Sequence, residues 1–453
     1  MAIIAPFKGV TYNLDKIAGM ENIVAPPYDI ISNNDQDYYY EKNPYNVVRL
    51  ILGKKKTGDS DWDNRYTRAA DYFKKWISDE ILIRSKEPSV YLTSLEYNSP
   101  YNTTTKTRWA FISLVRIEES DSQIIMPHEK TFSFHRQDRL KLMRACNTQF
   151  SPIFGLYKDE DNTIFKRFDS VINSLPQISF TDRDGSNYRM WEVNSSSILK
   201  NISSEMVSKS IVIADGHHRY ETARNYRNIL RARYGILHTG RAHDYVMMYL
   251  TNIADEGISI LPTHRLIKFN THFDTARFFT SVGKYFDPIL FPFSPENQKN
   301  IQSIFLDQLK DHGTNKTAIG FYYHQAKNFY ILLLKPGARE SLGDDLHPSL
   351  KKLDVLALSR LILQNTLGIK RDELDNEEII QYESDATKSL SMVSSGECQM
   401  VFLLNSTKID QILEITGNSL LMPRKSTYFY PKIITGLVFN MIDPNEIIHI
   451  PDS

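Results

Sequence analysis

Apolar side chains recur at spacings of three and four residues between positions 61 and 78, as they do along one face of a helix. Two later stretches, 89–97 and 107–117, are instead rich in β-branched and aromatic residues, and a polar segment separates them. The first pattern predicts an amphipathic helix, and the second predicts a β-hairpin with a long connection. The apolar stripe of the helix consists of Tyr66, Ala69, Ala70, Phe73 and Ile77.

The rest of the chain continues to alternate between helix-like and strand-like patterns. Amphipathic helices are predicted over 220–230 and 354–367, and neither an internal repeat nor a regular βαβ series is visible. We therefore predict the α+β class, with a mixed sheet at the core. Short apolar runs of strand length lie at 211–214, 247–252, 318–323, 329–334 and 399–404.

The distribution of chemically interesting residues suggests two regions. The chain of 453 residues has the length of two or three domains. Candidate site residues are dense up to about position 270 and sparse after it. We predict a first region, 1–270, that carries the chemistry, and a C-terminal α+β domain, 271–453, that closes the site.

Composition and charge exclude several classes of protein. Lys and Arg number 54, and Asp and Glu also number 54, so the formal net charge is zero. This balance argues against a general nucleic-acid binder, whose surface is strongly basic. Hydrophobic residues at 41% and charged residues at 24% also exclude a wholly disordered chain, a collagen and a small disulfide-stapled scaffold.

Cysteine usage and hydropathy bear on the compartment. Cys146 and Cys398 are far apart and match no metal-binding spacing. Two reduced thiols in a cytosolic protein are expected, and one long-range disulfide stays an alternative. The first ten residues do not have the pattern of a signal peptide, and no run of 18 apolar residues is present. We expect a cytoplasmic protein with no membrane partner.

The most informative stretch is Asp215-Gly216-His217-His218-Arg219, which follows a short apolar run and opens a predicted helix. A helix start presents unpaired backbone N–H groups and a partial positive charge, which suit a phosphate. The glycine lets a ligand approach closely, the histidines supply ring N–H donors, and the arginine grips phosphate oxygens bidentately. The aspartate would accept a substrate proton or hold a metal ion.

Two other interpretations of this turn stay open. In the first, Asp215 caps an ordinary helix and the histidines are polar surface, which leaves the adjacent histidines and arginine of a glycine turn unexplained. In the second, both histidines hold one metal ion, although neighbouring residues of a helix do not share a face. We therefore favour phosphate binding.

Other residues of the first region are candidates for catalysis. Asp29 follows two prolines in a rigid turn, where it would contact substrate or only bond its own backbone. His128 and Glu129 follow a proline, and as a pair they would act as general base and orienting group. They lack the second histidine of the zinc helix motif. Asp138 and Arg139 are interpreted as a surface helix start.

Later candidates are basic or aromatic. His264 and Arg265 would add positive charge near a phosphate or hold the edge of a strand. Residues 422–432 are predicted to form a loop, in which Lys425 would neutralise phosphate and Tyr428 would stack on a base. The alternative is a surface loop with its tyrosines packed on the core. This segment lacks the upstream glycine of a P-loop.

Seven short motifs are spread over almost the whole chain. They are A-P-P-Y-D at 25–29, H-E-K-T at 128–131, D-R-L at 138–140, S-P-I-F-G at 151–155, D-G-H-H-R at 215–219, L-P-T-H-R at 261–265 and K-S-T-Y-F-Y-P-K at 425–432. Together they resemble the prokaryotic family DUF1015, from residue 6 to about residue 437. The family carries no established activity, so this resemblance implies kinship and not a function.

The D-G-H-H-R turn is also similar to the glycine-histidine-arginine turn of the ParB/sulfiredoxin superfamily, which includes CTP-binding partition proteins, sulfiredoxin and kinases of free serine. In that superfamily the turn opens a helix and holds nucleotide phosphates. The resemblance implies that Asp215 is a base or metal-holding group and that His218 and Arg219 contact phosphate. The chain lacks the cysteine that sulfiredoxin has beside its glycine, and no helix-turn-helix of a partition protein is evident.

The turn and the resemblance together lead us to expect a phosphotransferase. It would move phosphate between ATP or ADP and a hydroxylated, serine-like metabolite, with Mg²⁺ bridging the phosphate oxygens. Asp215, with Asp29 or Glu129, would orient the hydroxyl group. One alternative is a nucleotide-sensing module without turnover, and another is a metal-dependent phosphoesterase that uses His217, His128 and Asp215.

Overall fold

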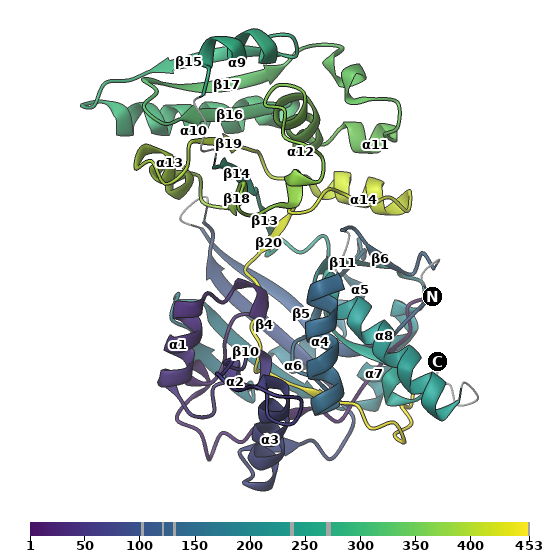
Figure 1. The fold of residues 1–453 in the computed structure, drawn as a ribbon. Coiled ribbons are helices and arrows are strands. Elements are labelled where there is room, and N and C mark those ends of the chain that lie inside the picture. The colour runs from purple at the N-terminus through teal and green to yellow at the C-terminus, as the bar shows by residue number, and fades with distance from the viewer. Residues whose placement is uncertain (101–103, 120–121, 130–132, 236–239, 269–272, 452–453) are drawn as a thin grey trace. The chain divides into compact units, whose positions relative to one another are not determined.

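The computed structural model describes residues 1–100, 104–119, 122–129, 133–235, 240–268 and 273–451. The chain divides into two compact units (Figure 1). Unit 1 consists of Met1–Ser259 and Pro431–Ser453, and unit 2 consists of Ile260–Tyr430. Whereas the sequence pattern places one boundary near residue 270, the compact units are joined after Ser259 and again after Tyr430.

A mixed sheet forms the centre of unit 1. Within the described residues its strand order is β6-β11-β8-β12-β5-β4-β10-β9, and β1 pairs with β5. β12 is antiparallel to β5 and parallel to β8, and β11 is parallel to β6 and antiparallel to β8, so the predicted α+β class with a mixed sheet is confirmed. The strands are β1 (Ile4–Ala5), β4 (Val90–Asn98), β5 (Thr105–Arg116), β6 (Ile125–Pro127), β8 (Ile153–Tyr157), β9 (Ile178–Thr181), β10 (Asn187–Val193), β11 (Ile211–Asp215) and β12 (Tyr245–Asn252).

Helices and two short ladders complete unit 1. The ladders pair β2 (Val10–Tyr12) with β3 (Leu82–Arg84) and β7 (Thr148–Gln149) with β21 (Asn440–Met441). The second ladder joins the C-terminal stretch of the chain to the segment before β8. The helices are α1 (Asn33–Lys42), α2 (Val48–Ile51), α3 (Arg65–Ser78), α4 (Ser133–Cys146), α5 (Thr163–Lys166), α6 (Asp169–Ile172), α7 (Ser196–Met206) and α8 (His217–Tyr234).

Helix α3 and the β4–β5 hairpin confirm the strongest sequence patterns. The side chain of Asn64 accepts hydrogen bonds from the backbone amides of Tyr66 (2.9 Å) and Thr67 (3.2 Å), so the helix begins at Arg65 instead of residue 61. Trp76, which is 2% exposed, completes its buried face in place of the expected Ile77. In the hairpin, β4 and β5 pair antiparallel over their whole overlap.

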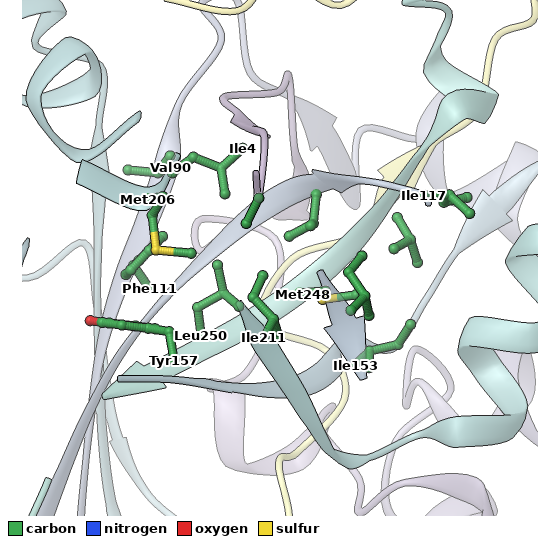
Figure 2. Close-up of a cluster of buried hydrophobic side chains, with 14 of the residues drawn as sticks. Ile4, Val90, Phe111, Ile117, Ile153, Tyr157, Met206, Ile211, Met248 and Leu250 are labelled. Carbon is green, nitrogen blue, oxygen red and sulfur yellow. The ribbon is translucent and has the colours of Figure 1, made fainter. Parts of the chain in front are cut away.

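One face of the unit 1 sheet carries the main hydrophobic core (Figure 2). Phe111, Met248 and Leu250 are each at most 2% exposed and pack there with Met206 from α7. Because successive side chains of a strand point to opposite faces, the neighbours of these residues, among them Tyr249, lie on the other face. Burying a large apolar side chain contributes about 1.5–3 kcal/mol, so this core fixes which strand residues face the candidate site.

Unit 2 is built on a second sheet, whose described strand pairs are all antiparallel. Within the described residues its sheet has the order β15-β17-β16-β19-β14-β18, and the antiparallel β16–β17 pair confirms the predicted hairpin. Its strands are β14 (His264–Ile267), β15 (Phe286–Pro292), β16 (Ala318–Tyr323), β17 (Asn328–Leu334), β18 (Ile380–Glu383) and β19 (Met400–Leu403). Its helices are α9 (Thr275–Val282), α10 (Gln298–Asn315), α11 (Pro348–Lys351), α12 (Asp354–Ala357), α13 (Ala386–Ser394) and α14 (Ile409–Gly417).

Two parts of unit 2 differ from the sequence prediction. The helix predicted over 354–367 is α-helical only in α12 and then widens into a π-helix over Leu358–Gln364. Ser359 donates its hydroxyl to the carbonyl of Val355 (2.7 Å), a bond that competes with the backbone ladder. The segment predicted as a loop contains strand β20 (Tyr428–Tyr430), which pairs with β13 (Ser259–Leu261).

Two further expectations concern thiols and membranes. Cys146 and Cys398 are both free, as expected for a reduced pair. Cys146 lies in α4 of unit 1, and Cys398 lies just before β19 of unit 2. Over the described part of the chain, every helix is too short or too polar to cross a bilayer.

Candidate functional site

The strand, turn and helix predicted around Asp215 are present. β11 ends at Asp215, Gly216 occupies the N-cap position, and α8 starts at His217. Gly216 has φ +92°, a left-handed conformation that side-chain-bearing residues rarely adopt. Because glycine offers no capping side chain, the first-turn amides of α8 are left to other acceptors or to a ligand. The helix start therefore has the polarity that an anion needs.

Two cations hold the Asp215 carboxylate. Its Oδ1 lies 2.5 Å from Lys432 Nζ, and its Oδ2 lies 2.5 Å from Arg219 Nη2. Arg219 also donates a hydrogen bond to the carbonyl of Pro152. The three charged side chains are only 12–15% exposed. Two positive charges and one negative charge leave this mostly buried cluster with one net positive charge.

The cations set the protonation state of Asp215. Burial would raise the pKa of this carboxyl, but the charges of Lys432 and Arg219 outweigh burial and hold the pKa well below its usual range. Asp215 is therefore a carboxylate at every pH at which the protein would work. A carboxylate of such low pKa is suited to accepting a hydrogen bond and orienting a hydroxyl group, and is poorly suited to removing a proton on its own.

His128 and His217 form a buried pair behind the turn. Their rings lie 4.5 Å apart in an edge-to-face arrangement, and His217 Nε2 accepts a hydrogen bond from the backbone amide of His128 (3.2 Å). His128 Nδ1 lies 2.6 Å from the carbonyl of Ile213, which identifies Nδ1 as the protonated nitrogen. Burial lowers the pKa of His128 from 6.5 to about 4, and burial beside His128 lowers the pKa of His217. Both rings are neutral at pH 7 and join β6 to the turn.

Three other candidates, Glu129, His218 and Asp29, differ in how buried they are. Glu129 Oε1 is 4.0 Å from His128 Nε2, and the Glu129 side chain is 21% exposed. His218 is half-buried in the first turn of α8. Asp29 is exposed in a short 3₁₀ turn, Tyr28–Ile30. The aromatic ring of the preceding Tyr28, and not the Asp29 carboxylate, lines a cavity with Arg219.

The interpretation of Asp138 and Arg139 as a surface helix start is wrong. α4 begins at Ser133, so both residues lie inside the helix, and Arg139 is only 8% exposed. Arg139 donates to Asp138 and to the carbonyl of Ile51 (2.7 Å), and its guanidinium lies 3.9 Å from the centre of the Tyr28 ring. A D-R pair on a polar helix face resembles ordinary surface in sequence, because nothing in the pattern shows which elements pack over it.

A cavity of about 50 Å³ lies between these elements of unit 1. It has room for a few water molecules, and therefore for a small anion and not for a nucleoside. Arg139 and Arg219 both line it, together with Ser151 and Thr222. The hydroxyl of Thr222 is buried and has no hydrogen-bond partner among the described residues. The rest of the lining is mainly apolar, so the two guanidinium groups and this hydroxyl are the groups that could contact a small oxyanion.

The four late candidates lie in unit 2. His264 is buried in β14, and its Nδ1 accepts a hydrogen bond from the amide of Leu404 (3.2 Å). Arg265 is 4% exposed and donates to the carbonyl of Lys425 (2.9 Å). Lys425 has φ +54°, and Tyr428 begins β20. Arg265 and Lys425 are thus in contact within unit 2, and the part of all four residues in phosphate binding stays a prediction.

Lys432 belongs to the basic, aromatic segment that the sequence singled out, but its pairing with Asp215 was not predicted. It ends the K-S-T-Y-F-Y-P-K motif, 217 positions after Asp215. Its attraction to a carboxylate leaves no periodic signal in the sequence. The sequence signal that could have pointed to Lys432 is the K-S-T-Y-F-Y-P-K motif. Two other motifs of unknown role, S-P-I-F-G with Pro152 and A-P-P-Y-D with Tyr28, also contribute residues beside Arg219.

Comparison with known proteins decides the family. The family model described as protein of unknown function DUF1015 matches residues 4–356, more than half of the chain. The chain belongs to the DUF1015 family. A search of curated proteins found no match. The DUF1015 motifs around Tyr28, His128, Arg139, Pro152 and Asp215 all lie in unit 1.

Solved structures show a weaker likeness to this DUF1015 protein. A free serine kinase mutant in complex with AMP is 12% identical, covers 69% of this chain and 89% of its own, and has a TM-score of 0.34. The same kinase with ADP is 11% identical at the same coverage and TM-score. SbnI from Staphylococcus aureus, truncated at its C-terminus, is 10% identical, covers 72% and 85%, and reaches 0.35. TM-scores of this size carry no argument about function.

Proposed function

We propose that unit 1 of this DUF1015 protein transfers a phosphoryl group between a nucleotide, ATP or ADP, and a hydroxylated small metabolite. The observation that carries the proposal is the net positive charge of the Asp215, Arg219 and Lys432 cluster at the N-terminus of α8, which no side chain caps. Phosphoryl transfer depends mainly on positioning and on charge neutralisation, and this cluster supplies both.

The roles of the residues follow from their contacts. A phosphate at the turn would take Arg219 and Lys432 as partners in exchange for part of their contact with Asp215. The Asp215 carboxylate, thereby freed, would accept the hydrogen bond of the acceptor hydroxyl and orient it. His128 and His217 hold the turn in place as neutral rings, because one ring nitrogen of each forms a hydrogen bond with a backbone group. Glu129 faces His128 and stays a candidate for contact with the hydroxyl group.

A bound Mg²⁺ would neutralise charge on the phosphate oxygens, as in other phosphoryl transfers. Among the described residues, no three His, Cys, Asp or Glu side chains come together as a metal site, and both oxygens of Asp215 contact cations. The residues therefore do not form a ready magnesium site, and no step here depends on one. We do not propose a metal-dependent phosphoesterase, because among the described residues His128, His217 and Asp215 do not come together as a metal site.

The direct test is incubation of the purified protein with ATP or ADP and a mixture of hydroxylated metabolites, followed by mass spectrometry. We expect a phosphorylated metabolite and the matching dephosphorylated nucleotide. Thermal unfolding with each nucleotide alone measures binding separately. Binding without any product would support a nucleotide-sensing module, and absence of binding would contradict the proposal.

Gly216→Ala tests whether the turn itself holds the ligand. At φ +92° an alanine costs about 1–2 kcal/mol, and its Cβ would lie 2.9 Å from Arg219 Nε, which has to move. Gly58 has the same φ with no atom within 4 Å of an added Cβ, so Gly58→Ala is the matched control. We expect both variants to lose stability, Gly216→Ala the more because Arg219 has to move, and only Gly216→Ala to bind nucleotide at least about tenfold more weakly. Equal affinities would show that the turn is structural.

A further inference from the structure

Helices α4 and α8 of unit 1 pack side by side (Figure 1), and residues of both line the cavity of about 50 Å³. Arg139 lines it from α4, and Arg219 lines it from α8. Burial and the adjacent Asp29 raise the pKa of Tyr28, a third lining residue, to about 12. The charges of both arginines oppose this rise, so the two guanidinium groups act on the same small region.

Each of the two arginines belongs to a cluster with one more cation than anion. Arg139 and Arg65 share the carboxylate of Asp138, whose side chain is 14% exposed. The Asp215 cluster likewise has two cations and one carboxylate. Asp29 is exposed to water, which screens its charge. The cavity therefore lies between two clusters that each carry one net positive charge, and an anion bound there would offset their repulsion.

Both guanidinium groups keep donors for a further acceptor. A guanidinium has five N–H groups. Arg139 uses three of them, two on Asp138 and one on the carbonyl of Ile51. Arg219 uses two, one on Asp215 and one on another backbone carbonyl. Within the described chain, two N–H groups of Arg139 and three of Arg219 are thus left for water or a ligand.

Thr222 is the lining residue that points most directly to a ligand. It is 0% exposed, and its hydroxyl forms no hydrogen bond with any described residue. A buried hydroxyl without a partner is unfavourable, and valine would fill the same space without that cost. The other uncharged polar side chains of the lining already have partners elsewhere in unit 1; they are Thr148, Gln149 and Ser151.

The size and polarity of the cavity select the kind of anion. A volume of about 50 Å³ holds roughly three to five water-sized groups. Inorganic phosphate carries oxygens on every side, and those turned toward an apolar wall would lack partners. A carboxylate matches the planar fork of arginine, and its short alkyl group would lie against the apolar wall. That wall consists of Ile51, Leu142, Met143, Phe150, Ile153 and Val246.

We propose that this cavity binds a small aliphatic monocarboxylate of the size of acetate or propionate. The carboxylate lies between Arg139 and Arg219, and one of its oxygens accepts the hydrogen bond of the Thr222 hydroxyl. The alkyl group occupies the apolar part of the cavity. This inference goes beyond the proposed function and does not depend on it, because the carboxylate needs no nucleotide in order to bind.

Calorimetric titration of the whole chain at constant pH and ionic strength tests the ligand class. The probes are acetate, propionate, acetamide, pivalate and inorganic phosphate, each without nucleotide. We expect acetate or propionate to bind at one site per chain. Acetamide has the size of acetate but no charge, so it should bind at least about tenfold more weakly, and pivalate should be too large. Failure of both small carboxylates to bind, or tighter binding of phosphate at this site, overturns the proposal.

Thr222→Val tests the contact with the hydroxyl. We expect acetate affinity to fall at least about tenfold, while the free energy of unfolding of the ligand-free protein stays equal or rises, because the hydroxyl that is lost has no partner in the described chain. Thr251→Val is the matched control. Thr251 is also 0% exposed with an unpartnered hydroxyl, and it does not line the cavity. Equal acetate affinities of the two variants would overturn the assigned contact.

Arg139→Lys tests the fork, because lysine keeps the charge but loses the planar set of donors. We expect acetate to bind about tenfold more weakly to this variant. Arg65→Lys is its control, since Arg65 shares Asp138 but does not line the cavity. Equal losses in the two variants would show that only the general charge matters and would contradict a carboxylate site. None of these titrations contains nucleotide, so their failure would leave the proposed function standing.

Discussion

Asp215→Asn is expected to lower turnover by at least about a hundredfold while nucleotide still binds. The asparagine keeps the shape of the side chain but removes the negative charge that orients the acceptor hydroxyl. Lys432 and Arg219 then lose their shared counter-ion, so their positive charges attract phosphate more strongly. Nucleotide affinity should therefore stay equal or increase. A fall in turnover without a fall in affinity distinguishes a catalytic role of Asp215 from damage to the fold.

The control for this variant is Asp63→Asn, which removes a carboxylate that pairs with Arg68 and is 73% exposed. An exposed pair contributes less than about 1 kcal/mol, so activity and stability should both be preserved. Both variants are measured for turnover with the acceptor found active, for nucleotide affinity by calorimetry, and for folding by circular dichroism. Turnover that persists in Asp215→Asn would show that the carboxylate only anchors the two cations.

The second large effect is a loss of stability in mild acid. The pKa of His128 is lowered from 6.5 to about 4 because the ring is buried, so below pH 6.5 the unfolded chain binds a proton that the folded chain excludes. The free energy of unfolding is therefore fully present above pH 6.5 and falls as the pH drops toward 4. For His128 alone the loss reaches about 3 kcal/mol, and the lowered pKa of His217 adds to it in the same direction.

In the whole protein, the unfolding of unit 1 can be followed separately from that of unit 2. All four tryptophans of the chain, Trp62, Trp76, Trp109 and Trp191, belong to unit 1, so their fluorescence follows its unfolding in urea. Between pH 7 and pH 5, unfolding free energy should fall steeply in the wild type and less steeply in His128→Gln. His449→Gln, at an exposed position, should behave as the wild type does. Parallel pH profiles of the wild type and His128→Gln would contradict the assignment.

The sequence predicted those parts of the fold that depend on residues close together in the chain. The stripe of α3, the β4–β5 hairpin and the strand–turn–helix at Gly216 each depend on periodicity or on one backbone conformation, and all are present. The start of α3 was missed by four residues because the cap is a single side chain, Asn64. Strand β20 was missed because its pairing with β13 joins segments far apart in sequence.

The candidate site likewise has one part that the sequence predicted and one part that it did not. Asp215, Gly216 and Arg219 form one turn, so their proximity could be predicted from adjacency. The meeting of Lys432 with Asp215, and of Arg139 with Tyr28, depends on tertiary packing, which leaves no trace in the spacing of residues.

The distance along the chain between Asp215 and Lys432 has a consequence for biosynthesis. All of unit 2, Ile260–Tyr430, is translated between the two residues. On the ribosome, β11 and α8 emerge long before the lysine that neutralises the turn, so the nascent unit 1 carries an unfinished ion cluster until unit 2 has left the exit tunnel. A protease cut within unit 2 would leave the two parts of the cluster on separate polypeptides, and a premature stop there would yield a chain that lacks Lys432.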